Sequence, residues 1–241
     1  DSAFLAVYNG FIFVKRFFRE MFRGRVEFQE IIKQAYAIGY RSLFLISLTG
    51  FITGMVFTKQ SRPSLAEFGA TSWLPSLVSI AIVRALAALV TALICAGRVG
   101  SSIGAELGSM RVTEQIDAME VSAVNPFKFL VVTRVIASTI TIPILMFYCT
   151  FVGLAGAFLN VSLTEGTSLL TFVEKAFEQI TFLDITTSLL KAIFYGFTIG
   201  MVGSYQGYYA QKGTEGVGRA ANSAVVTSMF LIFIEEVIIV Q

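Results

Sequence analysis

Long apolar runs alternate with shorter polar intervals along the chain, a pattern typical of a protein that crosses a membrane several times. The apolar runs cover about residues 38–58, 73–96, 129–161, 185–209 and 221–241. A helix of about 20 residues crosses the hydrocarbon core, so each run predicts a transmembrane helix. The run at 129–161 is too long for one straight span and short for two with a turn, so we interpret it as one long helix kinked near Pro143. The pattern predicts an all-α polytopic membrane protein with five transmembrane helices.

The segment ahead of the first run predicts an amphipathic helix. Apolar residues, most of them aromatic, recur there at spacings of three and four from Phe4 to Phe22. Basic residues occupy much of the remainder: Lys15, Arg16, Arg19 and Arg23. Such a helix is typical of a segment that lies in the headgroup region of an anionic leaflet, although packing against a soluble partner would give the same pattern. We therefore predict an N-terminal interfacial helix with a basic connection at residues 1–33 and one transmembrane domain at residues 34–241.

The longest strongly polar interval, residues 97–126, separates the second and third runs. If it is helical, Glu106, Thr113, Asp117 and Glu120 share one face, because they follow one another at offsets of 7, 4 and 3. A solvated loop is the alternative, but plain loops of this length are uncommon. We predict a helical element that docks on a partner outside the membrane.

The basic residues predict the orientation of the chain. Cytoplasmic loops carry an excess of Lys and Arg, so we place the N-terminus, residues 97–128 and residues 210–219 on the cytoplasmic side. That side then holds 13 of the 18 basic residues: Lys15, Arg16, Arg19, Arg23, Arg25, Lys33, Arg41, Arg98, Arg111, Lys128, Arg134, Lys212 and Arg219. The acid-rich interval 162–184, which contains the pattern of a short amphipathic helix, and the C-terminus are expected to face outward.

Composition limits the chemistry that the chain can perform. Hydrophobic residues make up 55% of the 241 residues and charged residues only 14%, and the mean hydropathy is +0.75. A soluble domain of this size could not bury so much apolar surface. The net charge of +2 is too small to indicate nucleic acid as a partner, and there is no histidine to serve as a general base or metal ligand. The sequence contains no GxxxxGK[ST] phosphate loop, so we expect neither catalytic residues nor ATP hydrolysis in this chain.

Two other classes of function stay open at this stage. An ion-coupled secondary transporter of an amphipathic substrate would use membrane carboxylates such as Glu235 and Glu236, although these lie near one end of the last run. A membrane-embedded enzyme would need a nucleophile and a base from the sparse carboxylates and lysines. ATP dependence of transport would argue against the first class, and turnover by the chain alone would support the second.

One charged residue, Arg84, lies inside the second run. A charge at that depth is costly unless it faces water, a partner or a ligand, so we predict that Arg84 binds a headgroup or lines a cavity. The alternative is that its side chain reaches the interface from near the start of the span. Phe51, Met55, Phe57 and Gln60, near the end of the first run, are further candidates for lining a cavity, and ordinary packing would explain them equally well.

Three stretches carry a family resemblance: AGRVGSSIGAELGSMRVTEQIDAMEVSAVNP from Ala96, GTEGVGRAANSAVV from Gly213 and IFIEEVIIVQ at the C-terminus. They resemble the MlaE/YrbE family of permease subunits, which belong to ABC transporters that move phospholipids or related lipids between membranes. The resemblance implies that the polar interval is a cytoplasmic coupling helix docking on the ATPase subunit. It assigns that role to Glu106, Met110, Arg111, Glu114, Asp117 and Met119.

The resemblance also implies the assembly around the chain. It implies a homodimer in the cell inner membrane with an outward-facing lipid cavity between the copies, and a cytoplasmic ATPase subunit that binds ATP and Mg. It further implies a periplasmic MCE-type lipid-binding protein and an accessory cytoplasmic subunit as partners.

The chain departs from this family in its second run. The family usually shows Arg-Glu-Leu-Gly-Pro there, and this chain has Arg84-Ala85-Leu86-Ala87-Ala88. Without the acidic neighbour, we expect Arg84 to be freer to meet a lipid phosphate.

Overall fold

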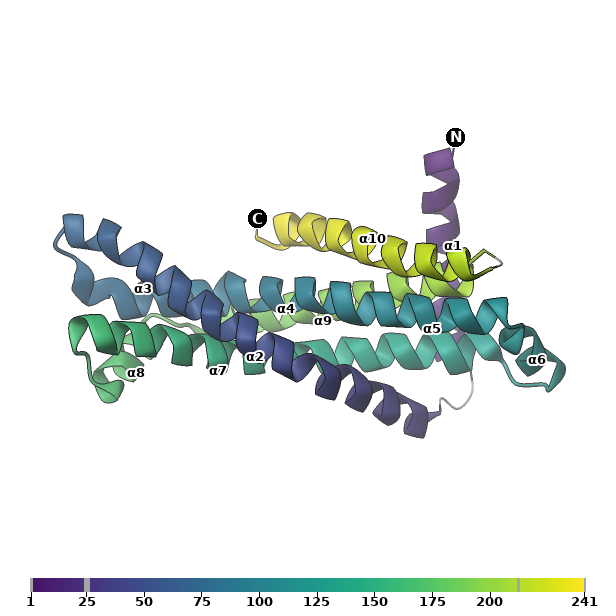
Figure 1. The fold of residues 1–241 in the computed structure, drawn as a ribbon, viewed down its shortest axis with the longest axis horizontal. Helices are drawn as coiled ribbons and strands as arrows, with labels where there is room; N and C mark the ends of the chain where they lie inside the picture. Colours follow the sequence, from purple (N-terminus) through teal and green to yellow (C-terminus); the bar gives the residue numbers. More distant parts are fainter. Residues whose placement is uncertain (1, 24–26, 212, 241) are drawn as a thin grey trace. The chain divides into compact units, whose positions relative to one another are not determined.

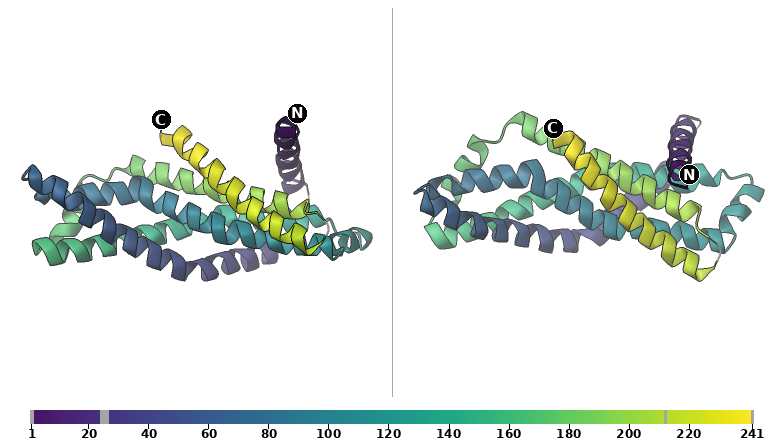
Figure 2. Two further views of the ribbon diagram at one scale, coloured as in Figure 1. Left: turned by 45° about the horizontal axis from the view of Figure 1, so that its top comes forward. Right: turned by 90° about the horizontal axis from the view of Figure 1, so that it is seen from above.

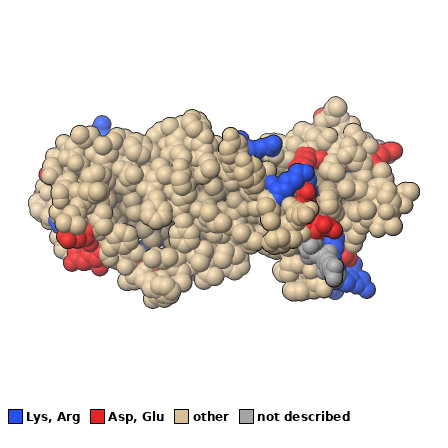
Figure 3. All heavy atoms as spheres, turned by 90° about the horizontal axis from the view of Figure 1, so that it is seen from below, with Lys and Arg blue, Asp and Glu red and all other residues tan. Residues whose placement is uncertain are grey.

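The computed structural model describes residues 2–23, 27–211 and 213–240, and every regular element within them is helical. Five helical segments are long and apolar enough to cross a membrane, which confirms the five predicted spans (Figure 1). They cover Phe28–Glu67, Thr71–Val112, Phe127–Glu165, Phe182–Tyr208 and Thr214–Ile239. On the face drawn in Figure 3, most of the surface belongs to uncharged residues, as expected for a protein in contact with lipid.

The spans extend beyond the predicted apolar runs. Helix α2 (Phe28–Glu67) begins ten residues before the first run and continues past its end at residue 58, through Lys59, Arg62 and Pro63. Hydropathy marks only the part of a helix that lies in hydrocarbon, whereas backbone hydrogen bonding continues into the polar flanks. Pro63 is exposed, so water can satisfy the backbone group that the proline leaves without a partner.

The second span changes helix type along its length. It comprises η1 (Thr71–Trp73), α3 (Leu74–Ala81), η2 (Ile82–Leu86), α4 (Ala87–Cys95), η3 (Ala96–Gly100) and α5 (Ser101–Val112). The segments η2 and η3 are π-helical. Turns of this kind occur frequently at functional sites, and Arg84 lies on the first of them.

The third span is one long helix, as predicted. It begins with the π-helical η4 (Phe127–Val132) and continues as α7 (Thr133–Glu165), with Pro143 inside it. The predicted short amphipathic helix after it is α8 (Leu169–Glu178), whose first turn is capped by the Ser168 hydroxyl. The remaining spans are α9 (Phe182–Tyr208) and α10 (Thr214–Val240).

The chain divides into two compact units, and several spans contribute to both. Unit 1 comprises Asp1–Tyr40, Cys95–Thr141 and Phe194–Gln241. In this unit α10 packs along η3 and α5, as both views of Figure 2 show. The contact is close because Gly104 faces the α10 backbone, where an added Cβ would lie 3.1 Å from the Ala220 carbonyl oxygen.

Helix α1 (Ser2–Met21) also belongs to unit 1, and it confirms the predicted N-terminal helix. Its most buried side chains are Phe13 and Phe17. The Phe13 ring meets the Phe127 ring edge-to-face, and the Arg16 guanidinium lies 4.3 Å from the centroid of the Phe127 ring. Phe13, which the predicted series does not include, packs on η4 together with this buried side of the helix, whereas Phe22, just past the end of α1, is exposed.

Unit 2 comprises Arg41–Ile94 and Ile142–Ile193. Here α2 and α7 meet through glycines, and an added Cβ on Gly54 would lie 1.9 Å from the Gly153 carbonyl oxygen. Helix α3 packs against α8 in the same unit. Small residues at a helix crossing allow backbones to approach closely, which is how membrane helices gain packing energy.

Candidate functional site

The polar interval between the second and third spans is not one straight helix. Helix α5 ends at Val112, Glu114 adopts a left-handed backbone with φ of 58°, and the short helix α6 follows at Gln115–Val121. The Thr113 hydroxyl donates to the Ser109 carbonyl oxygen at 2.9 Å and helps to close α5. The predicted stripe of Glu106, Thr113, Asp117 and Glu120 on one helix face is therefore wrong, because the left-handed Glu114 separates two helices.

Glu106 faces another membrane helix. Its carboxylate accepts a hydrogen bond from Arg134 of α7 at 2.8 Å, and the Arg134 side chain is only 3% exposed. Arg134 also donates to the Leu130 carbonyl oxygen at 2.9 Å. Glu106 thus neutralises a buried guanidinium and ties α5 to α7 inside unit 1.

The other predicted coupling residues surround the turn between α5 and α6. Arg111 pairs with Asp117 across the turn at 2.6 Å, and Glu114 is exposed. Met110 and Met119 are partly buried. The structure therefore places five of the six residues predicted to couple at the turn, with Glu106 on α5 ahead of it.

An apolar tip follows the turn. Ile116 is fully buried and anchors α6 to unit 1, whereas Val121 at the end of α6 is 90% exposed. Val124, three residues further on, is also exposed. The sequence analysis did not single out these valines, which lie within a strongly polar interval.

Arg84 has a carboxylate partner after all. Its Nε donates to Asp184 of α9 at 2.6 Å, while the Arg84 side chain remains 55% exposed. Asp184 is held in place because the backbone N–H and hydroxyl of Thr181 both donate to its second oxygen at 2.8 Å. The expectation that Arg84 lacks a neighbouring carboxylate is therefore wrong, because the fold supplies one from a residue 100 positions away.

A second basic residue accompanies this pair. The Lys191 side chain, in α9, donates to the Arg84 carbonyl oxygen at 3.4 Å and is buried. Asp184 and Lys191 were not among the predicted site residues. Their separation of seven residues, two helical turns, puts them on one face of α9 and was the signal in the sequence.

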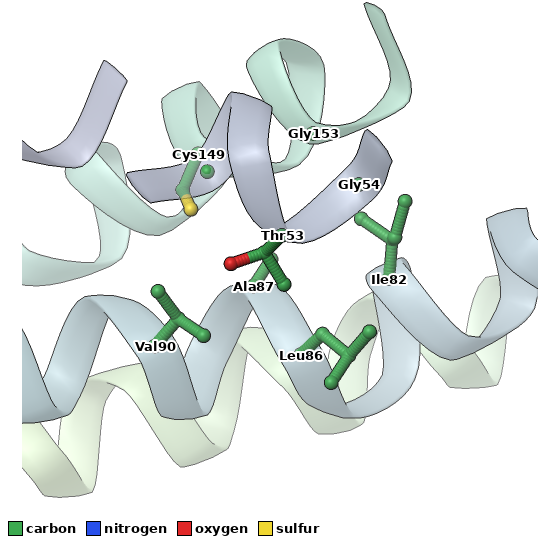
Figure 4. Close-up of a pocket in the computed structure, with 9 residues that line it drawn as sticks. Thr53, Gly54, Ile82, Leu86, Ala87, Val90, Cys149 and Gly153 are labelled. Carbon is green, nitrogen blue, oxygen red and sulfur yellow. The ribbon is translucent and has the colours of Figure 1, made fainter. Parts of the chain in front are cut away.

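The apolar candidates lie elsewhere on α2. Phe51, Met55 and Phe57 are partly exposed, and Gln60 is exposed. None of them lines the small gap drawn in Figure 4, which holds about 10 Å³ between the Gly54 stretch of α2, the Cys149 stretch of α7 and the second span. Leu86 and Ala87, from the stretch that departs from the family pattern, do line it. The substrate contacts assigned to the four α2 residues stay a prediction.

The membrane spans, the exposed turn outside them and the charged cluster at Arg84 together define the class of the protein, a polytopic helical membrane protein. Within the described ranges, no three His, Cys, Asp or Glu side chains gather as metal ligands.

Comparison with known proteins gives the family. Residues 31–241 match the Permease MlaE family. The chain is 38% identical over 211 residues to a probable ABC transporter permease protein of Rickettsia prowazekii, covering 88% of this chain and 82% of that one. It is 34% identical over 226 residues to a probable ABC transporter permease protein of Synechocystis, covering 94% and 86%. It is 31% identical over 217 residues to TRIGALACTOSYLDIACYLGLYCEROL 1 of Arabidopsis thaliana, covering 90% and 62%. The chain belongs to the MlaE permease family.

Proposed function

We infer that the chain is the permease subunit of an ABC transporter that moves phospholipids or related lipids between membranes, with ATP hydrolysed by a separate subunit. The observation that carries this inference is the family match over residues 31–241, which takes in four whole spans and nearly all of the first. Relatives from Rickettsia and Synechocystis are named as ABC transporter permeases, and the Arabidopsis relative is named after a glycerolipid. These names support both the energy source and the class of substrate.

The turn between α5 and α6 is the element that we assign to the ATPase. The left-handed Glu114 interrupts the helix, and α6 follows outside the span, with Val121 exposed at its end. Met110, Arg111, Glu114, Asp117 and Met119 would contact the ATPase subunit, which binds ATP and Mg. Glu106 would act behind this surface by fixing α5 to α7, so that movement of the turn reaches the span.

The cluster of Arg84, Asp184 and Lys191 is the position that we assign to the lipid headgroup. The Arg84 guanidinium lies beside the Lys191 ammonium, and cations of both kinds form charge-assisted hydrogen bonds with phosphate. The Arg84 side chain is more than half exposed, which leaves it accessible to a ligand. Phe51, Met55, Phe57 and Gln60 would contact the remainder of the lipid.

The assembly follows the family pattern in this proposal. Two copies would enclose a lipid cavity in the inner membrane, with the N-terminus, including an interfacial segment at residues 1–33, and the coupling interval 97–126 in the cytoplasm. Residues 34–241 would form the transmembrane domain, with the 162–184 segment and the C-terminus in the periplasm. An MCE-type protein would exchange lipid there, and an accessory subunit would bind on the cytoplasmic side.

The test is lipid movement in proteoliposomes that contain the chain and the ATPase recovered with it from the native membrane. A matched preparation carries an ATPase whose phosphate-loop lysine is replaced by alanine. We expect movement of fluorescent phospholipid with ATP in the first preparation and none in the second. Movement driven by an ion gradient without ATP would overturn the proposal in favour of a secondary transporter.

A further inference from the structure

Two hollows lie side by side where α3 packs against α8 in unit 2. The first is a polar chamber of about 200 Å³ whose lining includes Lys175 and Glu178 of α8. The second is a groove of about 460 Å³ whose lining includes Leu65, Leu77 and Ile80. Both are lined by Trp73, Ser76 and Gln179, so they adjoin. Arg84 lines neither hollow, which makes this a site distinct from the cluster described above.

Hydrogen bonds between α8 and the η1–α3 stretch define the polar chamber. The Ser76 hydroxyl donates to the Lys175 carbonyl oxygen at 2.8 Å, and the Lys175 ammonium donates to the Ser72 carbonyl oxygen at 3.0 Å. An ammonium has three N–H donors, so the bond to Ser72 leaves other N–H groups of Lys175 that can bind a ligand. Lys175 and Glu178 stand three residues apart on α8, and a cation and a carboxylate therefore line one small space.

The groove has the size and lining of a site for an apolar chain. Its volume falls within the usual range of small-molecule sites, which are mostly apolar with a few polar groups that fix orientation. Leu65 comes from the end of α2, and Leu77 and Ile80 come from α3, at an end of two membrane spans. Trp73 is largely exposed beside them, as is common for tryptophan where an apolar region borders a polar one.

We propose that the paired hollows bind one zwitterionic phospholipid that carries a primary amine, with an acyl chain in the groove and the headgroup in the chamber. Lys175 would bind the lipid phosphate and Glu178 the amine. A purely anionic headgroup would meet the Glu178 carboxylate without an amine to offset it, so charge complementarity favours the zwitterion. The proposal rests on the lipid-transport function inferred above and adds a second lipid position to it.

The test uses the full chain with its ATPase in nanodiscs that contain equal amounts of phosphatidylethanolamine and phosphatidylglycerol. A trace of either lipid carries a photoreactive group at the end of one acyl chain, and cross-linked peptides are identified by mass spectrometry. We expect cross-links within residues 65–80, with the ethanolamine lipid favoured. The variant Glu178→Gln should reduce that preference about two- to fivefold, and Lys175→Gln should reduce cross-linking of both lipids by a similar factor. Glu174→Gln, at an exposed position of α8 that lines neither hollow, is the control and should match the unchanged chain.

The variant Ala70→Phe tests the groove separately, because Ala70 is part of its lining and the larger side chain should displace the acyl chain. Cross-links that stay the same in Glu178→Gln, Lys175→Gln and Ala70→Phe would come from ordinary boundary lipid and would overturn the proposal. Cross-links from Trp73 to a second copy or to another protein, in place of lipid, would overturn it as well. ATP-driven lipid transport by the same protein in proteoliposomes separates the two inferences, since transport without the specific cross-links would remove this site and leave the proposed function standing.

Discussion

Removal of the Glu106 carboxylate provides a sharp test of how the coupling turn is connected to the membrane. In Glu106→Ala, the Arg134 guanidinium loses a charge-assisted hydrogen bond of 2.8 Å and keeps the bond to the Leu130 carbonyl oxygen. Its Nε already lies buried without a partner. The change therefore leaves a buried positive charge with one neutral acceptor.

Breaking a buried ion pair from one side costs about 3–5 kcal/mol. The Glu106 side chain is 49% exposed, so water can partly replace it, and we reduce the expected loss to about 2–3 kcal/mol. Glu106→Gln keeps an acceptor for Arg134 and should lose about half as much. The double variant Glu106→Ala with Arg134→Met should be more stable than Glu106→Ala alone, because it removes the stranded charge.

The assay is unfolding in mixed micelles by titration with sodium dodecyl sulfate, followed by tryptophan fluorescence and circular dichroism. Glu174→Ala, at an exposed acidic residue of α8, is the control and should change the free energy of unfolding by less than about 0.5 kcal/mol. ATPase binding is measured on the same samples. A Glu106→Ala variant of unchanged stability that no longer binds the ATPase would refute the reasoning and return Glu106 to the docking surface.

Three further predictions concern the docking surface, the headgroup cluster and the helix crossing. Val121→Asp should lower recovery of the ATPase with the chain severalfold. The free energy of unfolding should stay unchanged, because Val121 is 90% exposed. Normal recovery of the ATPase would exclude the end of α6 from the interface. Arg84→Ala should reduce the amount of co-purified phospholipid about two- to fivefold and leave the dimer intact. Asp184→Asn should increase that amount, because the change releases the Arg84 guanidinium. If both variants changed the amount of lipid in the same direction, Arg84 would not be the headgroup ligand. Gly54→Ala should destabilise the chain by about 2–3 kcal/mol, because the added Cβ would lie 1.9 Å from the Gly153 carbonyl oxygen. Gly10→Ala is the control, because nothing lies within 4 Å of an added Cβ there, and it should be neutral or slightly stabilising. A thermal scan measures both variants.

The spans were predictable because each depends on a local property of the sequence. Hydropathy identifies about 20 consecutive residues that can remain in hydrocarbon, and it placed all five spans in order. It could not place the ends of α2 or α5, because helical hydrogen bonding continues past the apolar residues. It also could not reveal the left-handed backbone at Glu114, since that residue type commonly occurs within helices.

The side-chain partners at the site were harder to predict because they depend on tertiary contacts. Arg84 was recognised as a costly charge within a span, but its carboxylate comes from Asp184, which lies at the start of another span. Glu106 was recognised as a conspicuous acid, but the periodicity argument assigned it to a surface stripe when its partner is Arg134. Neither partner follows from the spacing of residues along one helix.

These two ion pairs have a common arrangement. In each, an arginine within a predicted apolar run meets an acidic residue nearer to the end of another span, one pair in unit 1 and the other in unit 2. An arginine inside a span is expensive, and apolar residues of similar volume would often be at least as stable. Stability alone therefore does not explain why the chain carries both arginines. The proposed function gives each a reason, since Arg134 would connect the proposed coupling stem α5 to a membrane helix and Arg84 would present a half-exposed guanidinium to a lipid headgroup. On this argument, replacing both members of the Glu106–Arg134 pair with apolar residues should preserve the fold and the lipid bound at Arg84, yet uncouple ATP hydrolysis from lipid movement.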